Sequence, residues 1–372
     1  MNTNNTMESD SSSRSSETVL LYYNLRKKMW VRPIFVERRD LGEFWTLVPQ
    51  LKNNLEKFSN YYRMSPTCLQ YMLDNITPLS NIGSILQLVN VLLQHLIDLE
   101  LALIILSAII EETLDLIYTS LSNIYLKFPT KNVWLRIADE FREKRYFPNC
   151  IGALDGKHIR IKKPKHSGSL YFNYKGYYSV VLIFLVDANY NLTVINIGNY
   201  GRSSDGGIFY NSRFGQLLNS GELNLPEKVP LDHNTVPLPF VIIADEAFRL
   251  SENLLKPFPR RDLNYQKKIF SYRLSHARQM VECTFGILVS KFRIFETSIS
   301  IAPEKVDTII KTACLLHNII RQRDQLDNDA PIFDRKLKFN LSQLQTNLKL
   351  RKLDIILFYI FLINCKNRVF CI

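Results

Sequence analysis

Residues 150–160 read CIGALDGKHIR and place one aspartate, Asp155, inside an otherwise apolar, β-compatible stretch. Apolar residues lead into the carboxylate and isoleucines continue beyond it, a pattern typical of a strand. A carboxylate in a buried strand is costly unless a cation or hydrogen bonds compensate its charge. The alternative is a two-residue Asp-Gly hairpin turn at 155–156 between two short strands, since this dipeptide is a strong turn signal.

Composition favours a folded protein with an acidic partner. The chain has 372 residues, 46% of them hydrophobic, which is enough for a substantial core in two or three domains. Its formal net charge of +12 favours a polyanion, nucleic acid first. Its six cysteines form no Cys-x-x-Cys pair, so we expect free buried thiols. Two apolar runs, 101–110 and 355–363, are too short to span a bilayer, and the polar N-terminus has no signal-peptide pattern, so we expect no membrane contact.

Two further apolar runs predict buried strands beside aspartates. Residues 179–186, SVVLIFLV, lead into a polar turn in which Asp187 is expected to be only a turn residue, and 192–198 return as the partner strand. The run 240–244, FVIIA, ends at Asp245. The first of these runs therefore ends at a polar turn, and the run 240–244 ends at an aspartate.

Helical patterns precede and follow these strands. Ser65-Pro66 predicts a helix start, and Thr130 is expected to cap a second helix. Residues 303–321 predict a further helix, which includes His317. This histidine has no ligand partner at metal spacing, so a structural role is favoured.

Two more acidic residues complete a candidate constellation. Asp205 lies in the glycine-rich stretch GRSSDGG, which we expect to be a loop. Glu282 lies on a helix predicted over 271–293, four residues after Arg278, so a surface ion pair is the alternative to a functional role.

Four converging carboxylates would repel one another and raise their pKa values. Divalent cations remove that repulsion, and hard oxygen ligands suit Mg²⁺ or Mn²⁺. Two such ions can activate a water and stabilise the leaving oxygen of a phosphodiester displacement. Together with the positive net charge, this chemistry indicates DNA as the substrate.

Six blocks of the chain, in this order, resemble the successive motifs of PIF/Harbinger-type transposases and their domesticated nuclease relatives. They are GALDGKHI, YFNYKGYYSVVLIFLVDANYNL, GRSSDGGIF, FVIIADEAF, YRLSHARQMVECTFGIL and CLLHNII. The resemblance extends from about Trp30 to Arg323 and is strongest from Asn149 onward.

The resemblance implies an α/β fold, a ribonuclease H-like DDE catalytic core with a mixed sheet flanked by helices, preceded by an N-terminal helical region. It implies Asp155, Asp245 and Glu282 as catalytic residues, and the same three with Asp205 as ligands of Mg²⁺ or Mn²⁺. Candidate phosphate contacts are Lys157, His158, Lys162, Lys163 and Lys165, with a solvated face as the alternative for the lysines.

The expected organisation has four parts. They are a disordered polar tail at 1–28, a helical region at 29–146 with a degenerate helix-turn-helix, the DDE endonuclease domain at 147–323, and a basic, then apolar tail at 324–372. The stretch 82–118 is almost uniformly apolar, whereas relatives have a patterned helix pair there.

We therefore expect a metal-dependent DNA endonuclease or transposase-derived nuclease. A catalytically silent DNA-binding or adaptor protein is the alternative, and a metal phosphatase or RNA-directed nuclease is a second rival. The resemblance also implies a nuclear protein, with the cytoplasm as a second compartment. It implies a separate Myb-like DNA-binding protein as partner and leaves room for a homo-oligomer.

Overall fold

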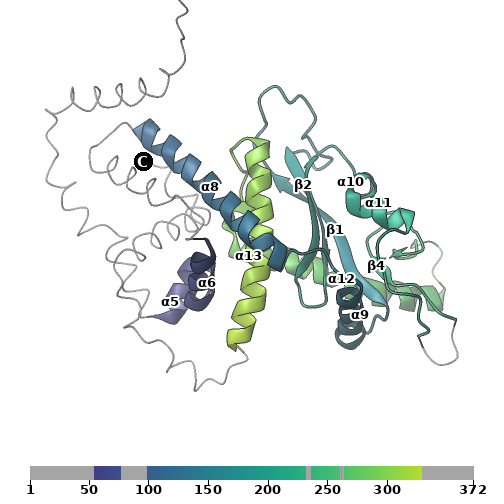
Figure 1. The fold of residues 1–372 in the computed structure, drawn as a ribbon. Coiled ribbons are helices and arrows are strands. Elements are labelled where there is room, and N and C mark those ends of the chain that lie inside the picture. The colour runs from purple at the N-terminus through teal and green to yellow at the C-terminus, as the bar shows by residue number, and fades with distance from the viewer. Residues whose placement is uncertain (1–53, 77–98, 232–235, 260, 262–263, 329–372) are drawn as a thin grey trace, which may run out of the picture.

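A five-stranded mixed sheet forms the centre of the computed structural model, which describes residues 54–76, 99–231, 236–259, 261 and 264–328 (Figure 1). The strands are β1 (Cys150–Arg160), β2 (Ser179–Val186), β3 (Leu192–Tyr200), β4 (Val241–Ile243) and β5 (Leu254–Leu255), in the order β3-β2-β1-β4-β5. β1, β2 and β3 pair antiparallel, whereas β4 and β5 run parallel to β1. This is the mixed α/β core expected of a ribonuclease H-like fold, so the predicted fold class is confirmed.

Helices cover both faces of the sheet. They are α5 (Leu55–Tyr62), α6 (Pro66–Ile76), α8 (Leu99–Tyr125), α9 (Lys131–Arg145), α10 (Asp205–Asn211), α11 (Arg213–Ser220), α12 (Tyr265–Lys291) and α13 (Pro303–Asn328), with the 3₁₀ turn η3 (Arg293–Phe295). α10 and α11 lie on the opposite side of β1 and β2 from α12 (Figure 1). None of the helices described combines the length and hydropathy that crossing a lipid bilayer requires.

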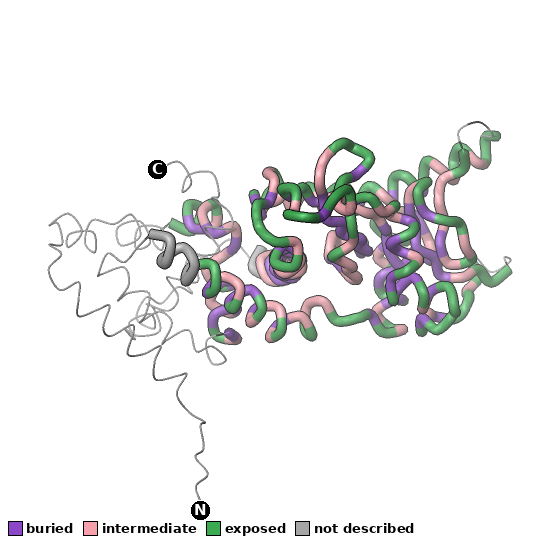
Figure 2. Tube along the Cα trace, turned by 90° about the horizontal axis from the view of Figure 1, so that it is seen from above, coloured by how far each residue is buried: buried purple, intermediate pink, exposed green. Residues whose placement is uncertain are grey.

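The hydrophobic core follows the sheet. All eight residues of β2 are buried, which explains its uninterrupted apolar sequence, because both faces of a central strand are covered. Figure 2 shows buried residues gathered along the strands and on the inner sides of the helices, with exposed residues outside. Phe58 and Tyr62 of the N-terminal aromatic stretch are also buried, so they serve packing.

Several local predictions are confirmed. Ser65 accepts a hydrogen bond from the backbone of Cys68 just before α6, as an N-cap does. Asp187 accepts hydrogen bonds from the backbone N–H groups of Asn189 and Asn191, so it is a turn residue. Thr130 is at the N-cap of α9, although its side chain makes no capping hydrogen bond.

Other predictions are wrong. The Asp-Gly hairpin alternative fails because β1 continues through residues 155 and 156 in unbroken pairing with β2. Asp205 is not in a loop: the Ser204 side chain caps the backbone N–H of Gly207 and starts α10 at Asp205. The helix predicted from residue 271 begins at Tyr265, because Asn264 caps it.

The cysteine prediction holds only in part. Cys68, Cys150 and Cys314 are free and buried, but Cys283 is exposed on α12. The predicted tail at 1–28, residues 82–98 of the apolar stretch and residues 329–372 of the tail predicted at 324–372 lie outside the described residues, whereas 324–328 continue α13.

The CLLHNII block joins α13 to the sheet. Asn318 is buried, accepts a hydrogen bond from the Leu192 N–H, and donates to the carbonyls of Leu192 and Tyr125. The adjacent His317 is also buried, and its Nε2 bonds the carbonyl of Tyr190 at 2.8 Å. The structural role predicted for His317 is therefore confirmed.

The buried His317 makes the fold sensitive to acid. Burial, aided by the nearby positive charges of Arg321 and Lys291, lowers the pKa of His317 from 6.5 to about 4. Between these values the unfolded chain binds a proton that the native protein does not, so stability falls as pH drops from about 6.5 to about 4, by up to about 3 kcal/mol.

The prediction is tested by urea unfolding of the wild type and of His317→Gln across this pH range. The variant has lost the titrating group, so the difference between the two unfolding free energies should shrink on acidification. Parallel pH profiles for the two proteins would contradict the assignment.

Candidate active site

Strand register brings Asp155 and Asp245 to the same level of the sheet. Ala153 of β1 pairs with Ile243 of the parallel strand β4, and each aspartate lies two residues beyond its member of that pair. Neighbouring strands are about 4.8 Å apart, so the two residues are neighbours across the strands. The aspartates that sequence analysis placed on separate strands therefore lie at one level of the sheet, and Asp245 is near enough to raise the pKa of Asp155.

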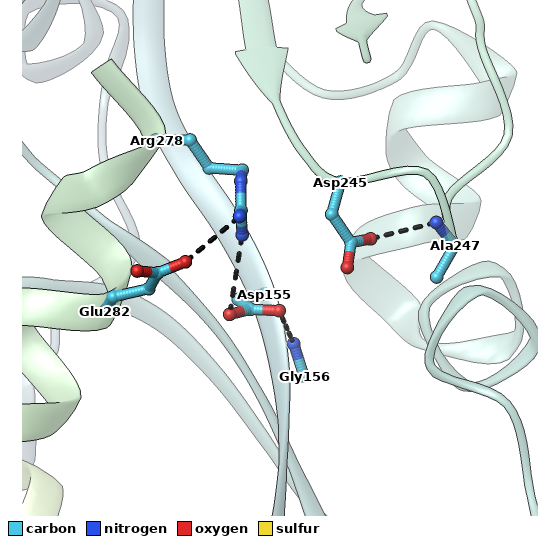
Figure 3. Close-up of polar contacts among 6 residues, drawn as sticks. All are labelled: Asp155, Gly156, Asp245, Ala247, Arg278 and Glu282. Carbon is cyan, nitrogen blue, oxygen red and sulfur yellow. Dashed lines mark hydrogen bonds and ion pairs between the residues drawn. The ribbon is translucent and has the colours of Figure 1, made fainter. Parts of the chain in front are cut away.

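Asp155 is largely buried in the middle of β1, with a side chain only 19% exposed (Figure 3). Its Oδ1 accepts a hydrogen bond from the Gly156 N–H at 2.9 Å, and its Oδ2 lies 3.8 Å from Nη1 of Arg278 on α12. The pKa of Asp155 is raised to about 6, chiefly by burial and also by Asp245 and Asp205, while the Gly156 hydrogen bond and Arg278 oppose the rise. The cost of this buried charge is therefore only partly compensated.

Asp245 lies just beyond β4, where its Oδ1 accepts a hydrogen bond from the Ala247 N–H at 3.0 Å (Figure 3). This hydrogen bond orients the carboxylate toward the loop that follows β4. Within the described residues, the other oxygen makes no hydrogen bond or ion pair.

Asp205 reaches the site from the opposite face of β1. It is the first residue of α10, and its carboxylate lies directly over Gly156, so that a Cβ added there would meet the Asp205 carboxyl carbon at 2.3 Å. Oδ1 of Asp205 is buried and makes no hydrogen bond within the described part of the chain. Burial and then Asp245 raise the pKa of Asp205, while Lys175 lowers it.

Among the described residues, Glu282 contacts the site only through Arg278. Its Oε1 lies 3.1 Å from Nη2 of that arginine, one turn away on α12, and its side chain is 62% exposed. The ion pair named as the alternative role is thus present. The same guanidinium also contacts Asp155, so Arg278 bridges the two carboxylates (Figure 3).

The donor chemistry of the site suits a hard divalent cation. Within the described ranges no group of three acidic, histidine or cysteine residues is close enough to hold an ion. Mg²⁺, however, is commonly held by one or two carboxylates together with water and substrate phosphate. Asp155 and Asp245 meet that requirement, and the unpartnered oxygen of Asp205 is a further donor.

The candidate phosphate contacts follow the acidic residues along the chain. Lys157, Lys162, Lys163 and Lys165 are exposed, and His158 is half-buried with Nδ1 2.9 Å from Ser179 Oγ. Lys157 lies over the Phe285 ring at 4.6 Å, and Lys163 lies over Tyr178 at 5.7 Å. Their role in DNA binding stays a prediction.

Sequence reasoning missed two residues of this site. Arg278 was assigned only to Glu282, because its contact with Asp155 joins positions far apart in the chain. Gly156 was considered as a turn residue, whereas the structure uses its missing side chain to admit Asp205. A glycine in a strand interior does signal a close approach of another group, and that signal was available.

A mixed sheet with aspartates on adjacent central strands and helices on both faces defines a DDE-type catalytic core. Residues 154–318 match the family described as "DDE superfamily endonuclease". The match agrees with the DDE catalytic core that the resemblance implied.

Two groups of curated relatives match the chain. "Protein ALP1-like" of Arabidopsis thaliana is 29% identical over 213 residues, covering 56% of this chain and 52% of that protein. "Putative nuclease HARBI1" of Homo sapiens is 26% identical over 203 residues, covering 52% of this chain and 53% of that protein. The chain thus spans about half the length of these curated relatives. No solved structure matches it.

The close approach of Asp205 to Gly156 predicts a specific clash. Gly156→Ala should push the Asp205 carboxylate away and destabilise the fold by about 1–3 kcal/mol, the usual cost of overpacking. In an Asp205→Ala background the same substitution should cost much less, because the clashing group has gone.

Chemical unfolding of the two single variants and the double variant measures this coupling. Gly286→Ala is the matched control, because nothing lies within 4 Å of its added Cβ in α12; it should stabilise by about 0.5–1 kcal/mol. Equal costs of Gly156→Ala in both backgrounds would show that Asp205 is not the obstacle.

Proposed function

We propose that this chain is a transposase-derived, divalent-metal-dependent DNA endonuclease that hydrolyses phosphodiester bonds. The observation that carries the proposal is the position of Asp155 and Asp245 at one level of adjacent strands, with Asp205 against the same strand. The match of residues 154–318 to the DDE endonuclease family and the word "nuclease" in the name of several relatives support it.

The acidic residues would hold the metal. Asp155 and Asp245 are the proposed first ligands, with Asp205 as a further ligand and Glu282 once Arg278 releases it. A bound Mg²⁺ or Mn²⁺ supplies an activated water and stabilises the leaving oxygen of the phosphodiester. Arg278 holds the carboxylates in place without the ion, since it pairs with both Asp155 and Glu282.

Basic side chains near the acidic residues would hold the DNA backbone. Lys157 follows Asp155 in β1, and three more of the proposed lysines follow in the segment after that strand: Lys162, Lys163 and Lys165. Their positive charge offsets phosphate repulsion by the carboxylates. A nuclear location, a Myb-like partner protein and a homo-oligomer remain proposals that rest on the family resemblance.

A catalytically silent DNA-binding or adaptor protein is the second candidate. Glu282 is tied to Arg278, and the described carboxylates do not form a group of three around one point. If that arrangement persists in solution when metal is present, the protein would bind DNA without cleaving it.

We predict that Mg²⁺ or Mn²⁺ stabilises the wild-type fold, because cations relieve carboxylate repulsion in the native state. At a metal concentration a hundred times the dissociation constant, the gain is about 2.7 kcal/mol. Thermal melts with and without metal test this, with Asp155→Asn as the variant that should lose the shift. An equal shift in both proteins would place the ion elsewhere.

We also predict that Glu282→Gln abolishes nicking of supercoiled DNA while leaving the fold and DNA binding nearly unchanged. Glutamine is almost isosteric, and the apolar side of α12, including Val281 and Leu288, is untouched. Glu143→Gln, on the exposed side of α9, is the matched control. Nicking near wild-type rates in Glu282→Gln would leave Glu282 as only the ion-pair partner of Arg278.

A further inference from the structure

The connection between β1 and β2 presents an aromatic ring to solvent. Tyr174 is 80% exposed, although a tyrosine ring gains free energy when it is buried. It lies in the block YFNYKGYY, to which neither the fold nor the proposed chemistry assigns a role. An exposed ring in a fixed position is available to stack on a ligand.

The loop beneath this ring is rigidly built around Asn173. Asn173 is buried, its Oδ1 accepts hydrogen bonds from the N–H groups of Lys175 and Tyr177, and its Nδ2 donates to Ser179 Oγ at 2.9 Å. Its backbone N–H donates to the Tyr177 carbonyl, and Gly176 adopts a positive φ of 80° that closes the turn. Tyr174 is therefore held outward by the loop, with little ordering cost left for binding.

Cationic and aromatic groups alternate around Tyr174. His158 meets its ring edge-on, with centroids 5.5 Å apart, and the Lys175 ammonium lies 5.3 Å from the ring centroid. Arg160 lies over Tyr177 at 4.4 Å. Such interleaving of rings and cations is the composition of surfaces that stack nucleobases and neutralise phosphates.

This surface adjoins the acidic site. The Arg202 N–H donates to the Leu170 carbonyl, which ties the segment leading into Asp205 to the start of the loop. Lys175 is close enough to Asp205 to oppose the rise of its pKa. His158 lies three residues beyond Asp155 in β1, about 10 Å along the strand.

We propose that Tyr174 is a stacking platform for an unpaired base of single-stranded DNA, with Lys175 on the adjoining phosphate, next to the carboxylates of the active site. The proposal rests on the proposed nuclease function and adds the form of its substrate. A base inside a duplex shows only its edges in the grooves, so a ring presented this way matches an unstacked base.

The test is binding of the full chain, in EDTA and at fixed salt, to a fluorescein-labelled single strand and to its duplex. Tyr174→Ala should weaken single-strand binding by roughly 5- to 150-fold, the range that corresponds to the loss of one base stack. Duplex binding should change less than about twofold. Tyr174→Phe keeps the ring and should bind as the wild type does.

Two further variants separate stacking from charge and from general exposure. Lys175→Ala should lower the slope of log affinity against log salt by about 0.7, the effect of one phosphate contact on a single strand. Tyr265→Ala removes a ring that is 78% exposed at the start of α12, and should leave binding unchanged. Thermal melts of all variants report whether each is folded.

A strand containing 2-aminopurine gives a direct signal of stacking. Its fluorescence should be quenched by the wild type and by Tyr174→Phe, but not by Tyr174→Ala. If Tyr174→Ala binds the single strand and quenches its fluorescence as the wild type does, while DNA cleavage is intact, the stacking proposal is overturned and the nuclease proposal stands. Failure of the wild type to bind either DNA would overturn both proposals, and tighter binding of the matching RNA strand would overturn the assignment to DNA.

Discussion

The burial of the Asp155 charge in the central strand is the constraint on which the site depends. β1 joins the antiparallel and parallel halves of the sheet, because residues 153–160 pair with β2 and residues 150–153 pair with β4. A carboxylate there persists only with compensation, which comes from the neighbouring N–H of Gly156 and from Arg278. The position of α12 over β1 is thus an electrostatic requirement as well as a packing one.

That compensation is incomplete, and the negative charge that stays uncompensated bears on the chemistry of the site. Asp205 and Asp245 both raise the pKa of Asp155, so the native arrangement concentrates negative charge that folding alone does not relieve. Arg278 supplies one positive charge, shared with Glu282. The divalent ion of the proposed function would carry twice that charge and prefer the same oxygens, so it would compete with Arg278 for Asp155. The close carboxylates therefore cost stability that the packing alone would not require, which is common where function sets the arrangement.

Much of the fold could be predicted from the sequence because its strands are unusually clear. The seven consecutive apolar residues of β2 and the run ending at Asp245 have one plausible state each, and the position of Asp245 follows from where its strand ends. The Asp155-Gly156 pair could not be decided locally, since a turn and a strand both suit it; only pairing with β2 excludes the turn. Likewise, the contact of Arg278 with Asp155 depends on tertiary packing and has no local sequence signal.

The glycines of this site show why composition misled the local predictions. GRSSDGG has the composition of a loop, yet the Ser204 cap supplies the first bonds of α10. Gly206 is required there for a different reason: an added Cβ would meet the Ala247 carbonyl oxygen at 2.5 Å, just beyond Asp245. Gly206 and Gly156 therefore both remove side chains where separate elements converge on the carboxylates. In this protein the glycines near the acidic residues permit close packing more than they permit flexibility, and that packing is what brings Asp205 to the strand of Asp155.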